Sequence, residues 1–405
     1  MPPESIDDGL SRNVYAFGFT SLFNDISTEM AYWVIPAFLV SIGAGPAQLG
    51  IIEGIAESVA SIAKLLAGYL ADRMPQRKPL VVAGYAVANI TKPFLGLASL
   101  WWHVLIVRFF DRVSKGLRSV PRDVMLAESV RKERLGAGFG LLQTMDSAGA
   151  VLGPLIAIVL LPRIGLRNVF WAAAVPGALA VLTVWFAIRE PRHTIPGALQ
   201  SRAGRTLRHF GFRGLPASFY YLIVAVSLFS LGNSSDMFLV LRAQNLGIAA
   251  RNAPLLGLVF NSTYTLAAWP FGKLSDRYSK PAVAAAGYLV FAATYLSFAA
   301  GASLSLIWVS MAIYGCYYAL TEPVLRALVG ASVEPQLRGR AFGIFAFATS
   351  LATLVSSIAA GELWQRYGAA VPFYFSAALA TVAALMLVGL SAFQAGRKGV
   401  ERQRA

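Results

Sequence analysis

The chain has 405 residues, of which 57% are hydrophobic and only 14% are charged, and its mean hydropathy is +0.60. Soluble domains are about 45–50% apolar and about 25% charged, so this composition excludes an ordinary soluble domain, a disordered chain and a collagen-like repeat. The single cysteine, Cys316, excludes an intrachain disulfide framework. The formal net charge of +15, on so apolar a chain, indicates basic loops at an anionic lipid surface rather than nucleic-acid binding.

Apolar windows long enough to cross a membrane recur along the whole chain. A spanning helix needs about 20 mostly apolar residues, because the hydrocarbon core is about 30 Å thick. Twelve windows meet this need, and a longer basic stretch separates the sixth from the seventh. The windows are 14–41, 48–71, 79–99, 102–126, 137–161, 168–188, 216–243, 253–275, 281–301, 304–328, 341–362 and 370–393.

We therefore predict an all-α membrane protein with 12 transmembrane helices in two pseudo-symmetric six-helix bundles. The predicted order is a cytoplasmic tail at 1–13, a bundle at 14–188, a basic cytoplasmic linker at 189–215, a bundle at 216–393 and a basic cytoplasmic tail at 394–405.

The distribution of charge predicts the orientation. The first residues are acidic, with Glu4, Asp7 and Asp8, which is opposite to the basic start of a secretory signal and indicates a retained cytoplasmic tail. With the N-terminus in the cytoplasm, few basic residues fall in the external loops. The other basic residues lie in cytoplasmic loops, in the tails or within spans, which agrees with the positive-inside rule. The five outside are Arg163, Arg167, Arg242, Arg251 and Arg366. We expect a multi-pass protein of the inner (plasma) membrane with both termini in the cytoplasm.

The two predicted halves contain related motifs in the same order. Gly68-Tyr-Leu-Ala-Asp72-Arg73 at the end of the second window recurs as Gly272-Lys-Leu-Ser-Asp276-Arg277 at the end of the eighth. A Gly-Tyr pair follows each of them, at 84–85 and at 287–288, so the offset stays at 203 or 204. A constant offset indicates an internal duplication, which is common in membrane transporters.

On these motifs the chain resembles the major facilitator superfamily over essentially its full length. The loop after the second window is similar to the signature of that family, and the run 111–123 resembles an uncharacterised prokaryotic subgroup of it. The resemblance implies alternating access, with a cytoplasmic latch at the loop signature and at its repeat. The residues that it assigns to this latch are Gly68, Asp72, Arg73, Arg77, Asp276 and Arg277.

A second motif of the family lies in the fifth window. Gly149-x-x-x-Gly153-Pro154 is similar to an element that is associated with exporters, and the resemblance implies a role in gating. The alternative is that the two glycines only allow two helices to pack closely.

Acidic residues within the first window are candidate proton carriers. Asp25 and Glu29 are four residues apart and share one helical face. Asn24 beside them is predicted to bind the substrate. Two carboxylates on one face resist joint ionisation, so one of them is suited to carry a proton. The alternative is that each pairs with a base on another helix and holds the fold.

The fourth window carries a stripe of basic residues on one face. Arg108, Arg112 and Lys115 are predicted to bind an anionic part of the substrate, and Asp111 with Arg112 to take part in proton coupling. A lipid-facing helix does not tolerate such a stripe. The alternative is that these bases pair with carboxylates such as Glu53, although we expect Glu53 to lie on a wet outer rim.

Polar and aromatic residues in the second half complete the candidate substrate site. They are Asn233 and Asp236 in the seventh window and Tyr314, Tyr318, Glu322 and Arg326 in the tenth. Aromatic rings at this depth fit an apolar or ring-containing substrate, although Glu322 and Arg326 are four apart and are able to pair with each other.

The sequence predicts a transporter and no enzyme. The three histidines are far apart without the spacing of metal ligands, and no ATP-binding P-loop occurs. We therefore expect no metal or cofactor, and a monomer whose partners are a small-molecule substrate, protons and the lipid bilayer. We predict proton-coupled efflux of a small organic molecule. The alternative is an importer or exchanger of an organic anion that is bound by the basic stripe. A more remote alternative is a membrane sensor that does not transport.

Overall fold

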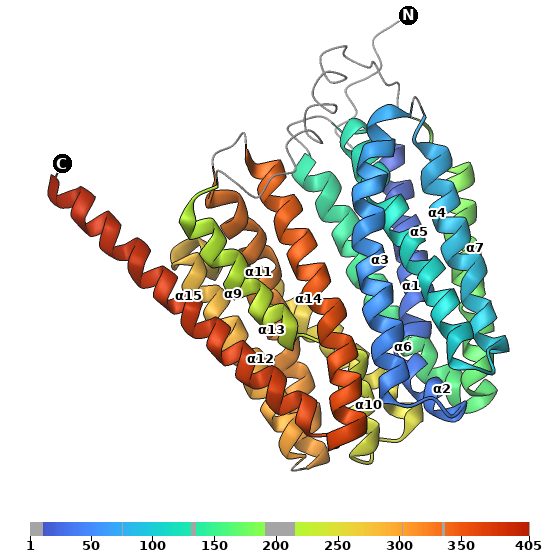
Figure 1. The fold of residues 1–405 in the computed structure, drawn as a ribbon. Coiled ribbons are helices and arrows are strands. Elements are labelled where there is room, and N and C mark those ends of the chain that lie inside the picture. The colour runs from blue at the N-terminus through green and yellow to red at the C-terminus, as the bar shows by residue number, and fades with distance from the viewer. Residues whose placement is uncertain are drawn as a thin grey trace, which may run out of the picture. The chain divides into compact units, whose positions relative to one another are not determined.

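The computed structural model describes residues 11–74, 76–130, 135–190, 215–301, 303–333 and 337–404. All regular structure in these ranges is helical, and no β-strand occurs in them (Figure 1). The prediction of an all-α protein is therefore confirmed.

The helices of the first half follow the predicted windows closely. They are α1 (Arg12–Tyr32), α2 (Ile35–Ser41), α3 (Pro46–Arg73), α4 (Lys78–Thr91), the 3-10 helix η1 (Lys92–Leu97), α5 (Trp101–Glu128), α6 (Leu135–Ala172) and α7 (Ala174–Phe186). α6 contains a break at Gly165, which has the left-handed φ of 74° that glycine favours. This break lies between the fifth and sixth predicted windows.

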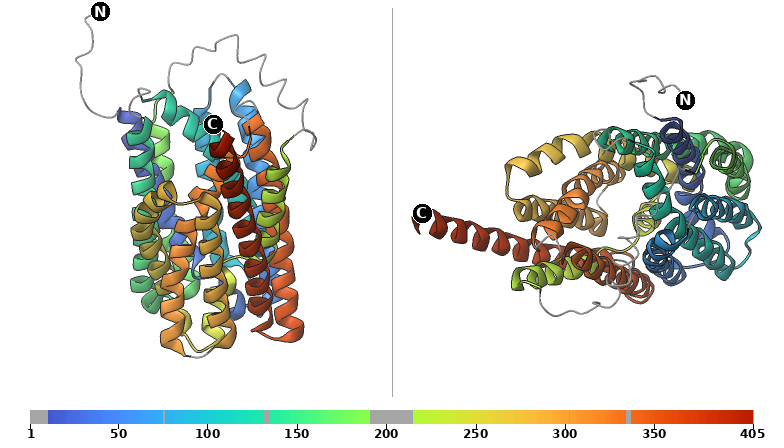
Figure 2. Two further views of the ribbon diagram at one scale, coloured as in Figure 1. Left: turned by 90° about the vertical axis from the view of Figure 1, so that its left-hand side faces the viewer. Right: turned by 90° about the horizontal axis from the view of Figure 1, so that it is seen from above.

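The second half continues in the same manner. Its helices are α9 (Ala217–Gly232), α10 (Met237–Asn245), the short η4 (Ala250–Asn252), α11 (Ala253–Arg277), α12 (Lys280–Ala300), α13 (Leu304–Ala331), α14 (Arg338–Tyr367) and α15 (Val371–Arg404). The last turns of α15, dark red in Figure 2, extend past the neighbouring helices. The residues predicted to form a C-terminal tail thus continue this helix as far as Arg404.

The first helix of each half is interrupted. The chain leaves the helical path at residues 33–34, between α1 and α2, and at residues 233–236, between α9 and α10. Each of these two predicted windows therefore consists of two helical segments. Pro36 lies in the first turn of α2, where its missing N–H costs nothing. The run Asn-Ser-Ser-Asp at 233–236 consists of residues whose side chains compete with helical hydrogen bonds. Discontinuous helices are typical of binding sites in secondary transporters.

Seven helical segments within the described ranges are long and apolar enough to cross a membrane. One of them, 141–186, is 46 residues long and covers two predicted windows. The windows that do not qualify are 14–41, 48–71, 102–126 and 253–275. Two of these four, 14–41 and 102–126, contain seven of the polar and charged candidate residues, which lower their mean hydropathy.

The chain divides into two compact units, and each is described by itself. Unit 1 contains the described residues of Met1–Tyr32, Ile62–Leu97 and Phe109–Ala203. Unit 2 contains those of Trp33–Ser61, Ala98–Arg108 and Gly204–Ala405. α3 and α5 contribute to both units. The predicted domain boundary at the basic linker falls on 191–214, outside the described residues, and stays a prediction.

The helix contacts of the two halves follow the same pattern. In unit 1, α1 packs against α6 and α7, and α4 packs against α7. In unit 2, α9 packs against α14 and α15, and α12 packs against α15. Each contact joins helices at corresponding places in the two halves, which supports the internal duplication inferred from the motifs.

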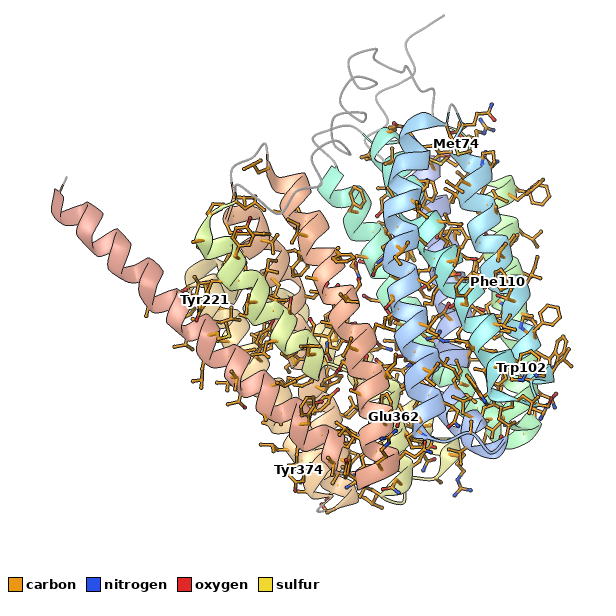
Figure 3. The ribbon with its side chains drawn as sticks, viewed as in Figure 1. Met74, Trp102, Phe110, Tyr221, Glu362 and Tyr374 are labelled. Carbon is orange, nitrogen blue, oxygen red and sulfur yellow. The ribbon has the colours of Figure 1, made fainter. Side chains whose placement is uncertain are left out.

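Apolar side chains cover the outside of the helices, whereas several charged side chains are buried. Trp102, Phe110, Tyr221 and Tyr374 are exposed and lie on the outside of their helices (Figure 3). Extended exposed apolar surface is characteristic of contact with lipid. The buried charged side chains are Glu53, Arg77, Lys92, Arg108, Asp111, Arg112, Arg118 and Arg242.

Candidate functional site

The carboxylate-bearing face of α1 lies against two glycines of α6 in unit 1. A β-carbon added at Gly149 would lie 2.8 Å from Asp25 Cβ, and one added at Gly153 would lie 2.7 Å from Glu29 Cβ. β-Carbons do not approach each other so closely, so α1 and α6 reach this distance because both positions are glycine. The predicted Gly-x-x-x-Gly-Pro motif therefore packs α6 onto the residues predicted to carry protons.

A buried lysine is connected to this face by hydrogen bonds. Lys92 Nζ donates to Thr28 Oγ1 at 2.8 Å and to Asn89 Oδ1 at 3.0 Å. Asn89 Nδ2 donates to Asn24 Oδ1 at 3.2 Å, and Asn24 Nδ2 donates to Asp25 Oδ1 at 3.0 Å. A continuous chain of side-chain hydrogen bonds thus joins the ammonium group of Lys92 to the carboxylate of Asp25.

A further carboxylate, Asp146 of α6, belongs to the same cluster. It lies near Ser21 of α1 and interacts electrostatically with Asp25 and Arg122. Asp146 precedes Gly149 by three residues, so both lie on the face of α6 that meets α1. Unit 1 therefore brings together the carboxylates of Asp25, Glu29 and Asp146.

The basic stripe of α5 is divided between different environments. Asp111 and Arg112 are buried, with 6% and 5% of their surface exposed, whereas Lys115 is exposed. Asp111, Asp25 and Arg112 all interact electrostatically with Lys92. Asp111 and Arg112 thus lie near Lys92, and their role in proton coupling stays a prediction.

Two further arginines of α5 make contacts within the protein. The guanidinium carbon of Arg118 lies 4.6 Å from the centroid of the Tyr85 ring, which is a cation–π contact. Arg122 donates to Asp123 Oδ1 at 2.9 Å and to Ser21 Oγ at 3.0 Å. These positions agree with the alternative in which the stripe holds the helices together.

The predicted cytoplasmic latch lies partly outside the described residues. The backbone of Gly68, Asp72 and Arg73 lies in α3, and that of Asp276 and Arg277 in α11, but their side chains are outside what the structure describes.

Arg77 is the described member of the latch. It donates from Nη1 to both carboxylate oxygens of Glu128, at 2.7 and 2.8 Å. Its backbone nitrogen and that of Lys78 donate to the two oxygens of Glu190, at 2.9 and 2.8 Å. Glu190 thus caps the start of α4, where a negative charge is favourable. A role of these contacts in gating stays a prediction.

In unit 2, Glu53 and Arg108 form a buried ion pair. Arg108 Nε and Nη2 donate to Glu53 Oε1 at 2.9 and 2.7 Å, and Nη2 also donates to Oε2 at 2.9 Å. Only 4% of the arginine side chain and none of the glutamate side chain is exposed. The expectation that Glu53 lies on a wet rim is wrong, because α3 and α5 pack these two groups against each other.

The same pair is connected to the break between α9 and α10. Ser235 Oγ donates to Glu53 Oε2 at 3.0 Å, and the Ser235 backbone nitrogen donates to Ser357 Oγ at 3.3 Å. Ser235 is free to make both bonds because residues 233–236 are not helical. α3, α5 and the break after α9 therefore meet at Glu53, and α14 is joined to them through Ser235.

Asp236, the last residue of this break, accepts hydrogen bonds from two tyrosines of α13. Tyr314 Oη donates to Asp236 Oδ1 at 2.7 Å, and Tyr318 Oη donates to Oδ2 at 3.1 Å. Asn233 Nδ2 donates to the hydroxyl of Tyr317 at 3.2 Å. The structure thus brings together four of the predicted substrate residues, namely Asn233, Asp236, Tyr314 and Tyr318.

The remaining two candidates pair with each other. Arg326 Nη2 donates to Glu322 Oε1 at 2.6 Å, and both side chains are substantially exposed. Tyr264 Oη donates to the other oxygen of Glu322 at 3.4 Å. The tyrosine connects this pair to the aromatic residues near Asp236, because the rings of Tyr264 and Tyr318 are 6.1 Å apart.

Sequence reasoning missed Lys92 and Asp146 as members of the site. Each carried a signal, since Lys92 is an isolated charge inside a predicted span and Asp146 lies one helical turn before Gly149. Ser235 had no comparable signal, because a serine beside a helix break is common and its partner is 182 residues away.

Comparisons with known proteins agree with this architecture. A family model described as Major Facilitator Superfamily matches residues 17–241 and 221–404. A protein of Methanocaldococcus jannaschii described as an uncharacterised MFS-type transporter is 33% identical over 390 residues, which cover 94% of this chain and 96% of the relative. Multidrug resistance protein MdtL of Escherichia coli O157:H7 is 27% identical over 164 residues, 40% of this chain and 42% of that protein.

A solved structure of the nucleoside transporter NupG superposes with a TM-score of 0.78. It covers 93% of this chain and 99% of its own, at 13% sequence identity. At this identity the likeness concerns the fold alone.

Proposed function

As a membrane transporter that belongs to the major facilitator superfamily, the chain moves a solute across the bilayer, and we propose that it exports a small organic molecule in exchange for protons. We also propose that all 12 predicted helices cross the inner membrane and that the two halves alternate access to a central site. The similarity of part of the chain to a multidrug resistance protein supports export as the direction.

The contact between α1 and α6 carries this proposal. The exporter-like motif places Gly149 and Gly153 directly against Asp25 and Glu29. Movement of α6 along α1 changes the surroundings of both carboxylates, since no side chain separates the two helices at these points. Protonation of the carboxylates and the packing of the two helices are therefore coupled.

Lys92 and Arg112 provide the opposite charge. The hydrogen-bonded chain through Asn89 and Asn24 connects Lys92 to Asp25. The positive charge of Lys92 stabilises the ionised form of Asp25. When Asp25 takes up a proton, Lys92 loses one of its negatively charged neighbours. Uptake of a proton thus redistributes charge among α1, η1 and α5.

Transport by reconstituted protein tests the proposal. Proteoliposomes loaded with ethidium, uridine or benzoate are given an imposed pH gradient, and efflux of each compound is followed. We expect the wild-type protein to export at least one of them in a gradient-dependent manner. The double variant Asp25→Asn, Glu29→Gln loses this dependence but still exchanges the compound across the membrane, because the proton sites are removed while the substrate site remains.

A matched variant controls for loss of charge. Glu362→Gln removes a carboxylate that forms an exposed ion pair with Arg366 on α14, and its transport stays dependent on the gradient. Full gradient-driven efflux by the Asp25→Asn, Glu29→Gln variant would contradict the assignment of these residues as proton carriers.

A further inference from the structure

We propose that Asp236 and the aromatic rings around it bind an organic cation, such as an amine or a quaternary ammonium compound, as the transported substrate. This inference rests on the proposed function, since it names the substrate class of the same transporter. It follows from the charge of Asp236, from the rings beside it and from its partial exposure.

The carboxylate of Asp236 has only neutral hydrogen-bond donors. Its partners are the hydroxyls of Tyr314 and Tyr318. Among the residues that the structure describes, no lysine or arginine forms an ion pair with it. Glu53 and Glu57 add further negative charge to its surroundings. An ionised carboxylate within a membrane-spanning segment is stabilised by a positive partner, and a cationic substrate provides one.

Two arginines of the same unit are already engaged with other carboxylates. Arg108 is bonded to both oxygens of Glu53 in the buried ion pair. Arg326 is bonded to Glu322. Neither guanidinium approaches Asp236 within ion-pair distance, so an anionic substrate finds a repelling carboxylate here.

Aromatic rings lie beside the carboxylate. The ring of Tyr318 is 5.5 Å from that of Tyr314, 5.2 Å from that of Phe260 and 6.1 Å from that of Tyr264, measured between centroids. Cations bind to aromatic faces within about 6 Å, and a desolvated contact of this kind contributes about 2 kcal/mol. Because Tyr314 and Tyr318 donate hydrogen bonds to Asp236, a cation at this carboxylate also lies near their rings.

The site suits an organic ion better than a metal ion. Asp236, Tyr264 and Tyr318 are partly exposed. Calcium requires six to eight oxygen ligands and magnesium requires an octahedral set. No group of three or more histidine, cysteine, aspartate or glutamate residues is arranged for a metal ion within the described ranges. Aromatic side chains instead favour alkylammonium groups.

Equilibrium binding to the purified full-length protein in detergent tests the inference without any gradient. Three probes are compared by titration calorimetry: benzyltrimethylammonium, its uncharged isostere neopentylbenzene, and benzoate. We expect the cation to bind at least about tenfold more tightly than the other two, because it alone satisfies the charge of Asp236.

Substitutions locate the binding. Asp236→Asn keeps an oxygen acceptor for the tyrosine hydroxyls but removes the charge, and we expect at least about a tenfold loss of affinity for the cation. Tyr318→Leu removes a ring and weakens binding by about two- to thirtyfold, whereas Tyr318→Phe keeps the ring and the affinity. Glu362→Gln, which removes an exposed carboxylate that is paired with Arg366, leaves the affinity unchanged.

Several results would overturn the inference. These are equal binding of the uncharged isostere, tighter binding of benzoate, and wild-type affinity in Asp236→Asn. Failure of benzyltrimethylammonium, tetramethylammonium and tetraphenylphosphonium alike to bind also overturns it. If Asp236→Asn does not fold, the contrast between Tyr318→Leu and Tyr318→Phe still distinguishes an organic-cation site from a sodium or proton site. Only binding of an organic cation depends on the aromatic ring.

The proposed function and this inference fail separately. Cation binding at Asp236 without gradient-driven flux contradicts proton coupling but leaves the substrate class intact. Gradient-driven flux of uridine or benzoate without binding of any cation contradicts the substrate class but leaves proton coupling intact.

Discussion

Glu53 and Arg108 illustrate how one contact decides between two roles for a charged side chain. An arginine in a predicted membrane span is either a substrate ligand or a structural partner. Arg108 donates three hydrogen bonds to Glu53, and both groups are buried. We therefore assign this pair to stability rather than to substrate binding.

Single substitutions in the pair are expected to destabilise the protein. Arg108→Met leaves Glu53 buried without its counter-charge, and removal of one partner of a buried ion pair costs about 3–5 kcal/mol. The double variant Glu53→Met, Arg108→Met is expected to melt at a higher temperature than either single variant, because it leaves no unpaired charge. Thermal melts of the purified protein in detergent measure this. An Arg108→Met variant with wild-type melting but impaired substrate binding would instead support a ligand role.

The packing of α6 on α1 depends on the absence of two β-carbons. At Gly149 an added β-carbon also lies 2.8 Å from the Leu22 carbonyl oxygen, and at Gly153 it lies 2.9 Å from that of Ile26. Backbone atoms cannot move aside as the end of a flexible side chain can. Any larger residue therefore separates the helices rather than merely shifting a neighbour.

Alanine at either glycine is expected to lower both stability and coupled transport. Gly149→Ala and Gly153→Ala each introduce overpacking, which costs about 1–3 kcal/mol. Gly389→Ala on α15 is the control, because its β-carbon meets only the Tyr221 hydroxyl at an ordinary 3.5 Å. Melting temperature and pH-driven efflux are measured for all three variants. If the two α6 variants behave like Gly389→Ala, the close contact is not needed for coupling.

Local sequence signals predicted the helices but not their interruptions and partners. The apolar windows located the helices because burial in lipid imposes a continuous run of apolar residues. The break at 233–236 was missed because Asn, Ser and Asp also occur on the polar face of an intact helix. Helical phase showed that Glu53 and Arg108 each share a face with other charges, but the choice of partner depends on which helices pack together.

The internal duplication accounts for the packing that the two halves share, whereas the residues at their candidate sites differ. Three helix contacts of the first half recur at corresponding places in the second, as the repeated motifs predict. Yet α1 places carboxylates opposite glycines, whereas the break after α9 places Asp236 opposite tyrosines. The motifs that repeat maintain packing, and the residues that do not repeat determine the chemistry.

The orientation of the whole chain in the membrane is testable by labelling. Cys316 is the only cysteine, so Cys316→Ser provides a background for single introduced cysteines. We expect Arg251→Cys to react with a membrane-impermeant maleimide in intact cells, and Tyr278→Cys to react only after permeabilisation, since the positive-inside rule places residue 251 outside and residue 278 inside. Both positions are exposed. The reverse pattern would contradict cytoplasmic termini.

The bonds around Glu53 also impose an order on biosynthesis. Glu53 and Arg108 leave the ribosome early, but Ser235 and Ser357, which complete the cluster, follow much later. At about 5–20 residues per second, the roughly 250 residues between Arg108 and Ser357 take about 12–50 seconds to synthesise. During that interval the ion pair exists without its serine partners. The contacts around Glu53 are therefore complete only after α14 has been synthesised.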